Sequence, residues 1–162
     1  MEIQVQFLRS AFILLVASYV AYACSCWRLT LEQSLCPQNN RTVLMAHAKT
    51  NATYTDYYGN ISTSPYASYA KYEMKMEEFF KNGTFPLGTD DGGFHMIFPR
   101  ISSLCGRAFN TSDSYLFVGR VDSGGNFRSD ICEYVKPKAE IVNNSTIMDI
   151  LHGNRERNCT HI

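Results

Sequence analysis

The residues whose types and spacing most clearly suggest chemistry are the six cysteines of this 162-residue chain. Three of them fall within the thirteen residues from Cys24 to Cys36. Zinc ligation and redox chemistry are the alternatives to disulfides, but the sequence has no Cys-x-x-Cys pair and its four histidines lie far apart. An even number of cysteines in an exported chain predicts disulfides, and sequence arithmetic leaves their pairing open. The cysteines are Cys24, Cys26, Cys36, Cys105, Cys132 and Cys159.

The first residues of the chain have the features of a secretory signal. Arg9 provides a positive charge, residues 11–21 form an apolar run, and an Ala-Tyr-Ala cleavage site ends at position 23. The apolar run is shorter than the roughly 20 residues that a membrane-spanning helix needs. We therefore expect residues 1–23 to be a signal peptide, and the secreted, extracellular protein, residues 24–162, to begin at Cys24.

Sequons for N-glycosylation agree with export. The sequence contains eight Asn-x-Ser/Thr triplets, and an acceptor asparagine needs an exposed loop. Several of them lie in polar, turn-like sequence, which predicts that the secreted protein is a glycoprotein. The candidate glycosylation sites are Asn51, Asn60, Asn82, Asn40 and Asn110.

The sequence contains few features that would indicate an enzyme. It has none of the motifs that mark zinc proteases, serine hydrolases or nucleotide-binding enzymes. Glu77 and Glu78 are adjacent, so on a strand they point to opposite faces and cannot act as a pair. The formal net charge is zero, which gives no electrostatic reason to expect nucleic acid or an anionic membrane as a partner. We therefore interpret the chain as a non-enzyme without those partners.

The remainder of the chain is predicted to be mainly β. Apolar and charged residues alternate along 69–80, which is typical of a half-buried strand. Residues 122–126 have the composition of a hairpin turn. Short strands followed by a C-terminal helix favour a small antiparallel barrel, with an OB-type Greek-key barrel as a candidate. The expected strands are residues 42–49, 69–80, 94–98, 114–121 and 127–135.

Local signals predict several further features. Residues 50–65 are expected to form a long loop or hairpin tip. Gly119 lies inside an apolar strand, which suggests a bulge or a close backbone approach. Near the C-terminus, Ser145 or Thr146 is expected to cap a helix that Gly153 ends.

The most unusual chemical group would be created by signal cleavage, which leaves a free α-amine on Cys24. The reference pKa of such an amine is about 7.7–8.0, so a fraction is neutral near pH 7. A neutral amine and the carbonyl of the same residue could chelate a catalytic zinc that has an open coordination position. Disulfides at Cys24 and Cys26 would make this terminus rigid, which lowers the entropic cost of binding.

Several stretches together resemble the tissue inhibitors of metalloproteinases. "CSCWRLTLEQSLC" is similar to their mature N-terminus, which begins Cys-x-Cys and has a third cysteine ten residues after the second, as Cys36 follows Cys26. "TVLMAHAK" and "YAKYEMKMEEFFKNG" resemble their first two strands, and "SSLCG" resembles the connector that carries the partner of the first cysteine. "SYLFVGRVDSGGNFRSDICEYVKP" and "NRERNC" are similar to their later hairpin and to the end of the inhibitory domain. The resemblance covers residues 24–159.

The resemblance implies a netrin-type module, which is an OB-like Greek-key barrel of five strands with flanking short helices. Thr30 and Gln33 could form a capping box that opens a short helix before Pro37. The family's second, six-cysteine domain has no counterpart here, so we expect a single-domain form. The three disulfides that the family implies are Cys24–Cys105, Cys26–Cys132 and Cys36–Cys159.

The resemblance also implies how the module acts on a protease. The Cys24 amine and carbonyl would chelate the catalytic zinc of the target, so the protein needs no cofactor of its own. Ser25 would enter the S1′ pocket, with Cys26, Trp27 and Arg28 along the primed side. Ser102, Ser103 and Leu104 would lie on the unprimed side.

Trp27 and Arg28 depart from the family pattern, which often has a small or aliphatic residue and then proline. Trp27 is either a new anchor at the protease surface or a side chain packed on the barrel. Arg28 removes a proline that would stiffen the strip and adds a charge. Target selectivity is therefore expected to depend on these two positions.

The function that follows is a monomeric inhibitor of secreted or membrane-anchored zinc metalloproteases, with extracellular matrix as a further partner. The alternative is a netrin-type extracellular module that binds matrix or signalling proteins without inhibiting a protease, because a fold does not fix a function.

Overall fold

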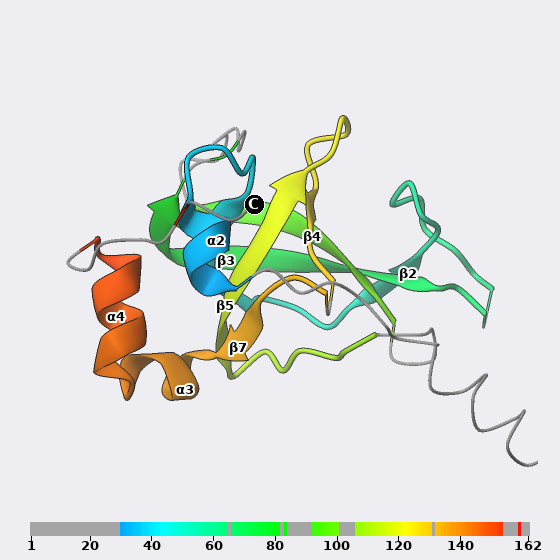
Figure 1. Ribbon diagram of the computed structural model, residues 1–162. Coiled ribbons are helices and arrows are strands. Elements are labelled where there is room, and N and C mark those ends of the chain that lie inside the picture. Colours follow the sequence, from blue (N-terminus) through cyan, green and yellow to red (C-terminus); the bar gives the residue numbers. More distant parts are fainter. Residues whose placement is uncertain are drawn as a thin grey trace, which may run out of the picture.

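The computed structural model describes residues 30–64, 66–81, 83, 92–100, 106–130, 132–153 and 159. The described part is mainly β, with one short helix before the strands and two after them (Figure 1). In chain order its elements are α2 (Leu31–Leu35), β1 (Thr42–Ala48), β2 (Thr53–Thr55), β3 (Tyr69–Lys81), β4 (Gly93–Pro99), β5 (Ser114–Val121), β6 (Phe127–Arg128), β7 (Val135–Pro137), α3 (Lys138–Val142) and α4 (Ser145–Leu151).

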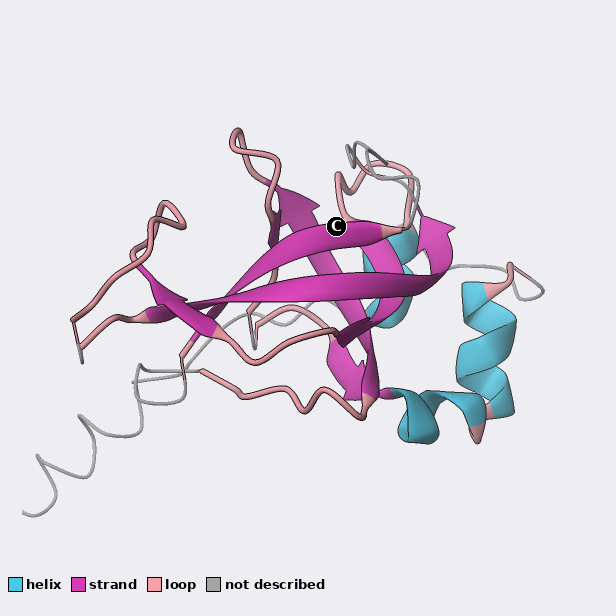
Figure 2. Ribbon diagram, turned by 180° about the vertical axis from the view of Figure 1, so that it is seen from behind, coloured by secondary structure: helices cyan, strands magenta, loops and turns pink. Residues whose placement is uncertain are grey.

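Five of the strands close into a ring, which confirms the predicted barrel. β1 pairs antiparallel with both β3 and β5, and β3 pairs antiparallel with β4. The ring is completed where β4 pairs parallel with β6, and β6 pairs antiparallel with β5. The long strand β3 pairs with β2 in a hairpin at its start and forms part of the barrel wall further along, as Figure 2 shows. β7 adds to β5 outside the ring.

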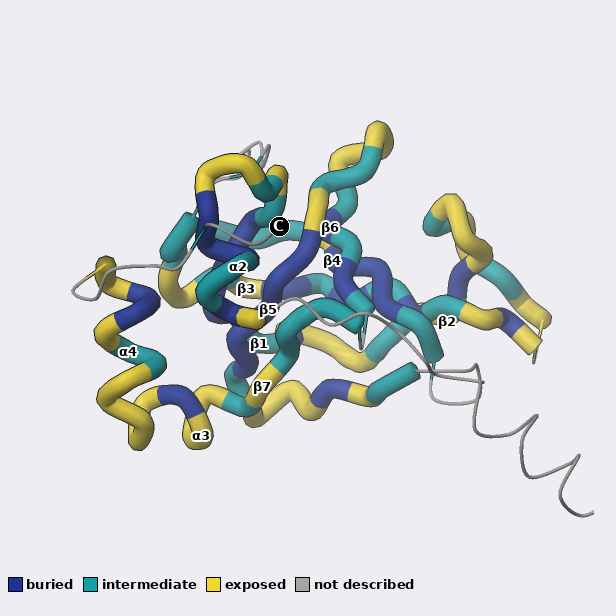
Figure 3. The backbone as a smooth tube through the Cα atoms, in the orientation of Figure 1, coloured by how far each residue is buried: buried dark blue, intermediate teal, exposed yellow. Residues whose placement is uncertain are grey.

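The strands β1 and β5 separate two apolar clusters, because successive side chains of a strand point to opposite faces. Leu44 and Ala46 of β1 face the barrel interior, whereas Val43 and Met45 face an outer cluster. The outer cluster includes apolar side chains of α2, α3 and α4, which cover this wall of the barrel. This cover explains why β1 is buried on both faces (Figure 3).

The predicted strand over 127–135 is wrong as a single element. β6 ends at Arg128 and β7 begins at Val135. Between them, Asp130 accepts hydrogen bonds from the backbone N–H groups of Cys132 at 2.7 Å and Glu133 at 3.2 Å. An aspartate that satisfies backbone donors in this way favours a turn over a ladder.

The two predicted caps of the C-terminal helix, Ser145 and Thr146, lie one and two residues after the observed cap. Asn144, and neither Ser145 nor Thr146, is the N-cap of α4, and its side chain accepts from the N–H of Ile147 at 3.2 Å. The predicted end is confirmed, since Gly153 has a φ of +74° directly after His152.

Two other local predictions are confirmed. A Cβ on Gly119 would lie 2.2 Å from the carbonyl oxygen of Arg128, so this glycine permits the close approach of β5 to the chain opposite. The segment after β1 is a hairpin tip, because β2 within it pairs with β3.

Glu77 and Glu78 contact different partners, in agreement with the prediction that these adjacent residues cannot act as a pair. Glu77 accepts from His47 Nδ1 at 2.8 Å, Ser114 Oγ at 2.5 Å and Lys138 Nζ at 2.9 Å, which ties α3 to the barrel. Partial burial favours its neutral form, but these hydrogen bonds outweigh burial and lower the pKa of Glu77 to about 2. Glu78 faces His152 instead, at 4.0 Å.

Candidate functional site

The predicted protease-contacting residues fall outside the described part of the chain. The same holds for the signal peptide, residues 1–23, for Cys105 and for the sequon at Asn82. What the structure defines is the framework on either side of the two predicted strips: α2 after the first strip, and residues 100 and 106 around the second. The contacting residues concerned are Cys24, Ser25, Cys26, Trp27, Arg28, Ser102, Ser103 and Leu104.

The helix α2 starts with the predicted capping box. Thr30 Oγ1 accepts from the N–H of Gln33 at 3.2 Å, and Gln33 Oε1 accepts from the N–H of Thr30 at 2.9 Å. Leu31 and Leu35 pack into the outer apolar cluster, where Leu35 is 1% exposed. The chain therefore has a fixed direction and position at Thr30, two residues after Arg28.

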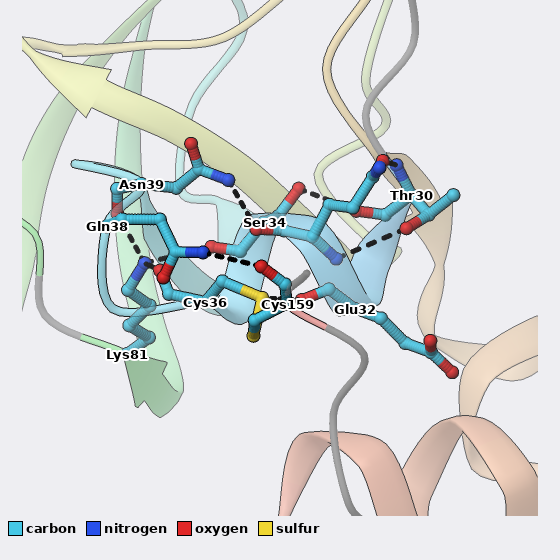
Figure 4. Close-up of a disulfide and its surroundings, with 9 residues drawn as sticks. Thr30, Glu32, Ser34, Cys36, Gln38, Asn39, Lys81 and Cys159 are labelled. Atoms are coloured by element: carbon cyan, nitrogen blue, oxygen red, sulfur yellow. Dashed lines mark hydrogen bonds between the residues drawn. A yellow bond between two sulfur atoms is a disulfide. The ribbon is translucent and has the colours of Figure 1, made fainter. Parts of the chain in front are cut away.

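A disulfide joins the end of α2 to the C-terminal part of the chain, which confirms the predicted pairing Cys36–Cys159. The two Cα atoms are 5.7 Å apart. Gln38 Nε2 donates to the carbonyl oxygen of Cys159 at 2.9 Å, so a hydrogen bond supports the same junction (Figure 4).

Lys81, the last residue of β3, organises the turn after α2. Its ammonium group donates to the carbonyl oxygens of Ser34 at 3.0 Å, of Cys36 at 2.6 Å and of Asn39 (Figure 4). These carbonyls include groups that the C-terminus of a helix leaves without an internal partner. Sequence reasoning missed Lys81, because its acceptors lie 42 to 47 residues away along the chain.

The second junction lies at Cys132, which is disulfide-bonded. Its predicted partner Cys26 is outside the described residues, so that pairing stays a prediction. The neighbouring Glu133 pairs with Arg41 at 2.9 Å. Burial raises the pKa of Glu133 and lowers the pKa of Arg41 against their mutual attraction, so this ion pair holds residue 133 against the barrel at a cost in desolvation.

The predicted connector, residues 101–105, leaves and rejoins the described fold at a narrow neck. The N–H of Arg100 donates to the carbonyl of Ser68 at 2.9 Å, and the N–H of Arg107 donates to the carbonyl of Pro99 at 3.4 Å. Two residues further on, Phe109 enters the barrel interior and contacts four aromatic rings at centroid distances of 4.8 to 5.4 Å. The neck is thereby fastened to the core.

The described candidate glycosylation sites satisfy the requirement for exposure. Asn40, Asn51, Asn60 and Asn110 are all exposed. Asn60 is also held by Asp56, which accepts from its side chain at 3.0 Å. Their occupancy stays a prediction.

A closed five-strand barrel with a short helix whose end is joined by a disulfide to Cys159 defines a class of small disulfide-bonded β-barrel modules. Within this class, the family model for tissue inhibitor of metalloproteinase matches residues 22–159. The chain therefore belongs to that family, whose proteins are extracellular inhibitors of metalloproteinases rather than enzymes. No curated protein matches the chain.

None of the helices among the described residues is long and apolar enough to span a membrane. Nor do these residues include a group of three or more His, Cys, Asp or Glu side chains arranged to hold a metal ion.

Proposed function

We propose that the protein is a secreted inhibitor of zinc metalloendopeptidases that chelates the zinc of its target through the α-amine and carbonyl of Cys24. The observation that carries this proposal is the family match over residues 22–159, which includes the tripeptide Cys24-Ser25-Cys26. The zinc belongs to the target, and residues 1–23 are removed on secretion.

The framework around α2 supports the proposal energetically. A strip that must be ordered on binding loses affinity, whereas a strip held in place beforehand does not. The capping box at Thr30, the Cys36–Cys159 disulfide and Lys81 fix the chain immediately after the strip. We infer that Cys24 and Cys26 are held from the other side by disulfides to Cys105 and Cys132.

The other residues of the two strips contact the protease on either side of the zinc, in the order in which they follow along the chain. Ser25 occupies the S1′ pocket, and Trp27 and Arg28 follow along the primed side, where they set selectivity. Ser102, Ser103 and Leu104 lie on the unprimed side, carried by the neck that Arg100 and Arg107 close.

The test is to block the α-amine without changing the fold. A protein with one additional alanine before Cys24 should show an inhibition constant at least ~100-fold higher, equivalent to about 2.7 kcal/mol of binding free energy. Mass spectrometry of both N-termini and equal thermal unfolding midpoints provide the control. Equal inhibition by the extended protein would exclude chelation by the amine.

The panel should include matrixin-, adamalysin- and astacin-type proteases. Failure of the native protein, with its N-terminus verified at Cys24, to inhibit any of them would favour a netrin-type binding module instead.

A further inference from the structure

A pocket of about 450 Å³ lies directly beside the neck of the connector. Its walls come from the hairpin of β2 and β3 and from the chain on both sides of the neck. Tyr54, Tyr72 and Phe109 provide aromatic surface, and Arg100 and Arg107 provide two positive charges. No carboxylate occurs among the described residues that line it.

The two arginines of this pocket are held by aromatic rings. The guanidinium of Arg100 lies 3.9 Å from the ring centroid of Tyr54, and that of Arg107 lies 5.4 Å from the centroid of Tyr115. A cation within about 6 Å of a ring centroid is attracted to the ring face, and the N–H donors of a guanidinium such as that of Arg107 lie in one plane that matches a carboxylate.

Arg107 differs from Arg41 and Arg128 in whether a carboxylate of the described residues pairs with it. Arg41 pairs with Glu133 at 2.9 Å, and Arg128 pairs with Asp122 at 2.5 Å. Within the described part of the chain, Arg107 has no carboxylate partner. Its positive charge is therefore not compensated by a carboxylate of the residues that the structure describes.

The position of the pocket connects it to the inhibitory surface of the proposed function. Arg100 directly precedes the connector, and Arg107 follows it by two residues. Because successive Cα atoms are about 3.8 Å apart, a connector of this length stays close to its neck. A protease engaged by Ser102 to Leu104 would thus bring its own cleft rim near both arginines.

We propose that this pocket receives an acidic side chain from the rim of the target's cleft on the unprimed side. The inference rests on the proposed function and deepens it, because it names a determinant of target choice. An Asp or Glu of the protease would accept paired N–H bonds from Arg107, in the geometry that guanidinium and carboxylate favour. Metalloproteases with a neutral or basic residue at that place would be inhibited less tightly.

The experiment compares three variants against one metalloprotease that the native protein inhibits and that has acidic residues at its unprimed rim. Arg107→Gln should raise the inhibition constant about tenfold and make it less sensitive to salt. Arg107→Lys keeps the charge and should recover part of the loss. Lys75→Gln removes the same charge from an exposed position of β3, about 16 Å along the strand from Ala70 of the pocket, and should leave inhibition unchanged.

The partner residue is then identified on the protease. Each acidic residue at its unprimed rim is changed to Gln, and the variant that responds should lose nothing more when combined with Arg107→Gln. If no protease variant couples with Arg107, or if Arg107→Gln inhibits like the native protein, the inference is overturned.

These outcomes are distinguishable from failure of the proposed function. Loss of inhibition in the alanine-extended protein together with full inhibition by Arg107→Gln would retain zinc chelation and reject the pocket. A native protein that inhibits no protease would reject both. Weaker binding of Arg107→Gln to a heparin oligosaccharide, with an unchanged inhibition constant, would assign the pocket to a sulfated glycan and overturn the inference.

Discussion

The α2 region and the β2–β3 hairpin use side chains in opposite ways. At α2, a disulfide, a capping box and one lysine fix the backbone, and Leu35, Cys36 and Ser34 are at most 1% exposed. In the hairpin, large apolar and aromatic side chains face solvent, with Tyr58 77% and Tyr66 88% exposed. Figure 3 shows this contrast as buried segments under α2 and exposed segments beyond β2.

The hairpin is nevertheless ordered. Asp56 Oδ1 accepts from the N–H of Asn60 at 2.9 Å, and Gly59 adopts a φ of +88° at the turn. Arg128, from the other side of the barrel, donates to the carbonyl of Tyr57 and lies 4.5 Å from its ring centroid. Polar contacts thus shape the hairpin although its side chains stay exposed, whereas the α2 region adds burial and a disulfide to its polar contacts.

The largest expected effect comes from the disulfide. Cys36→Ala with Cys159→Ala should lower the free energy of unfolding by about 2–5 kcal/mol, because the bond closes a very long loop of the unfolded chain. Urea denaturation of native and variant protein measures this change. A loss below about 1 kcal/mol would remove the basis of the comparison, since α2 would then be held mainly by packing.

A smaller effect is expected for Lys81. Lys81→Met should lower the free energy of unfolding by about 2 kcal/mol, because buried carbonyls of the turn after α2 lose a charged donor. The matched control is Lys136→Met, which breaks an exposed pair with Glu140 at 3.2 Å and should cost less than about 0.5 kcal/mol. Equal losses in both urea titrations would contradict the role given to Lys81.

The smallest effect is expected at the hairpin tip. Tyr58→Ala should change the free energy of unfolding by no more than about 0.5 kcal/mol, because an exposed side chain gains little burial on folding. The same urea titration measures it. A loss comparable to that of Lys81→Met would mean that the two regions do not differ in stability as the structure indicates.

The sequence predicts contacts between residues that are close together along the chain, but not contacts between residues that are far apart along it. The alternation that predicted β3 and the Thr30–Gln33 capping box are signals carried by nearby residues, and both are confirmed. The contacts of Lys81 and the ion pair of Arg41 with Glu133 join segments that only the closed barrel brings together. No local pattern distinguishes such residues from solvated lysines and glutamates.

In the candidate site, too, the sequence predicts some features and not others. Neighbouring residues with similar capping ability add a second difficulty at α4. The family pattern in the sequence predicted the pairing Cys36–Cys159, but the aromatic pocket at Arg107 depends on how three segments converge. At α4, the adjacent residues Asn144, Ser145 and Thr146 are all of types that cap helices, and the helix begins after Asn144. Propensity alone could not choose among them.

Closure of the barrel has a consequence for the behaviour of the protein in concentrated solution. A sheet that ends in free edges offers unpaired backbone groups to other chains, and long edges template aggregation. In the described structure, β2 and β7 have three residues each, β7 pairs only with β5, and the second side of β2 carries just an isolated bridge between Thr55 and Ile61. β7 ends in Pro137, which has no N–H to offer. The described fold therefore offers few unpaired strand edges to the strands of other chains. This favours a protein that stays in solution at concentrations where an open sheet would associate.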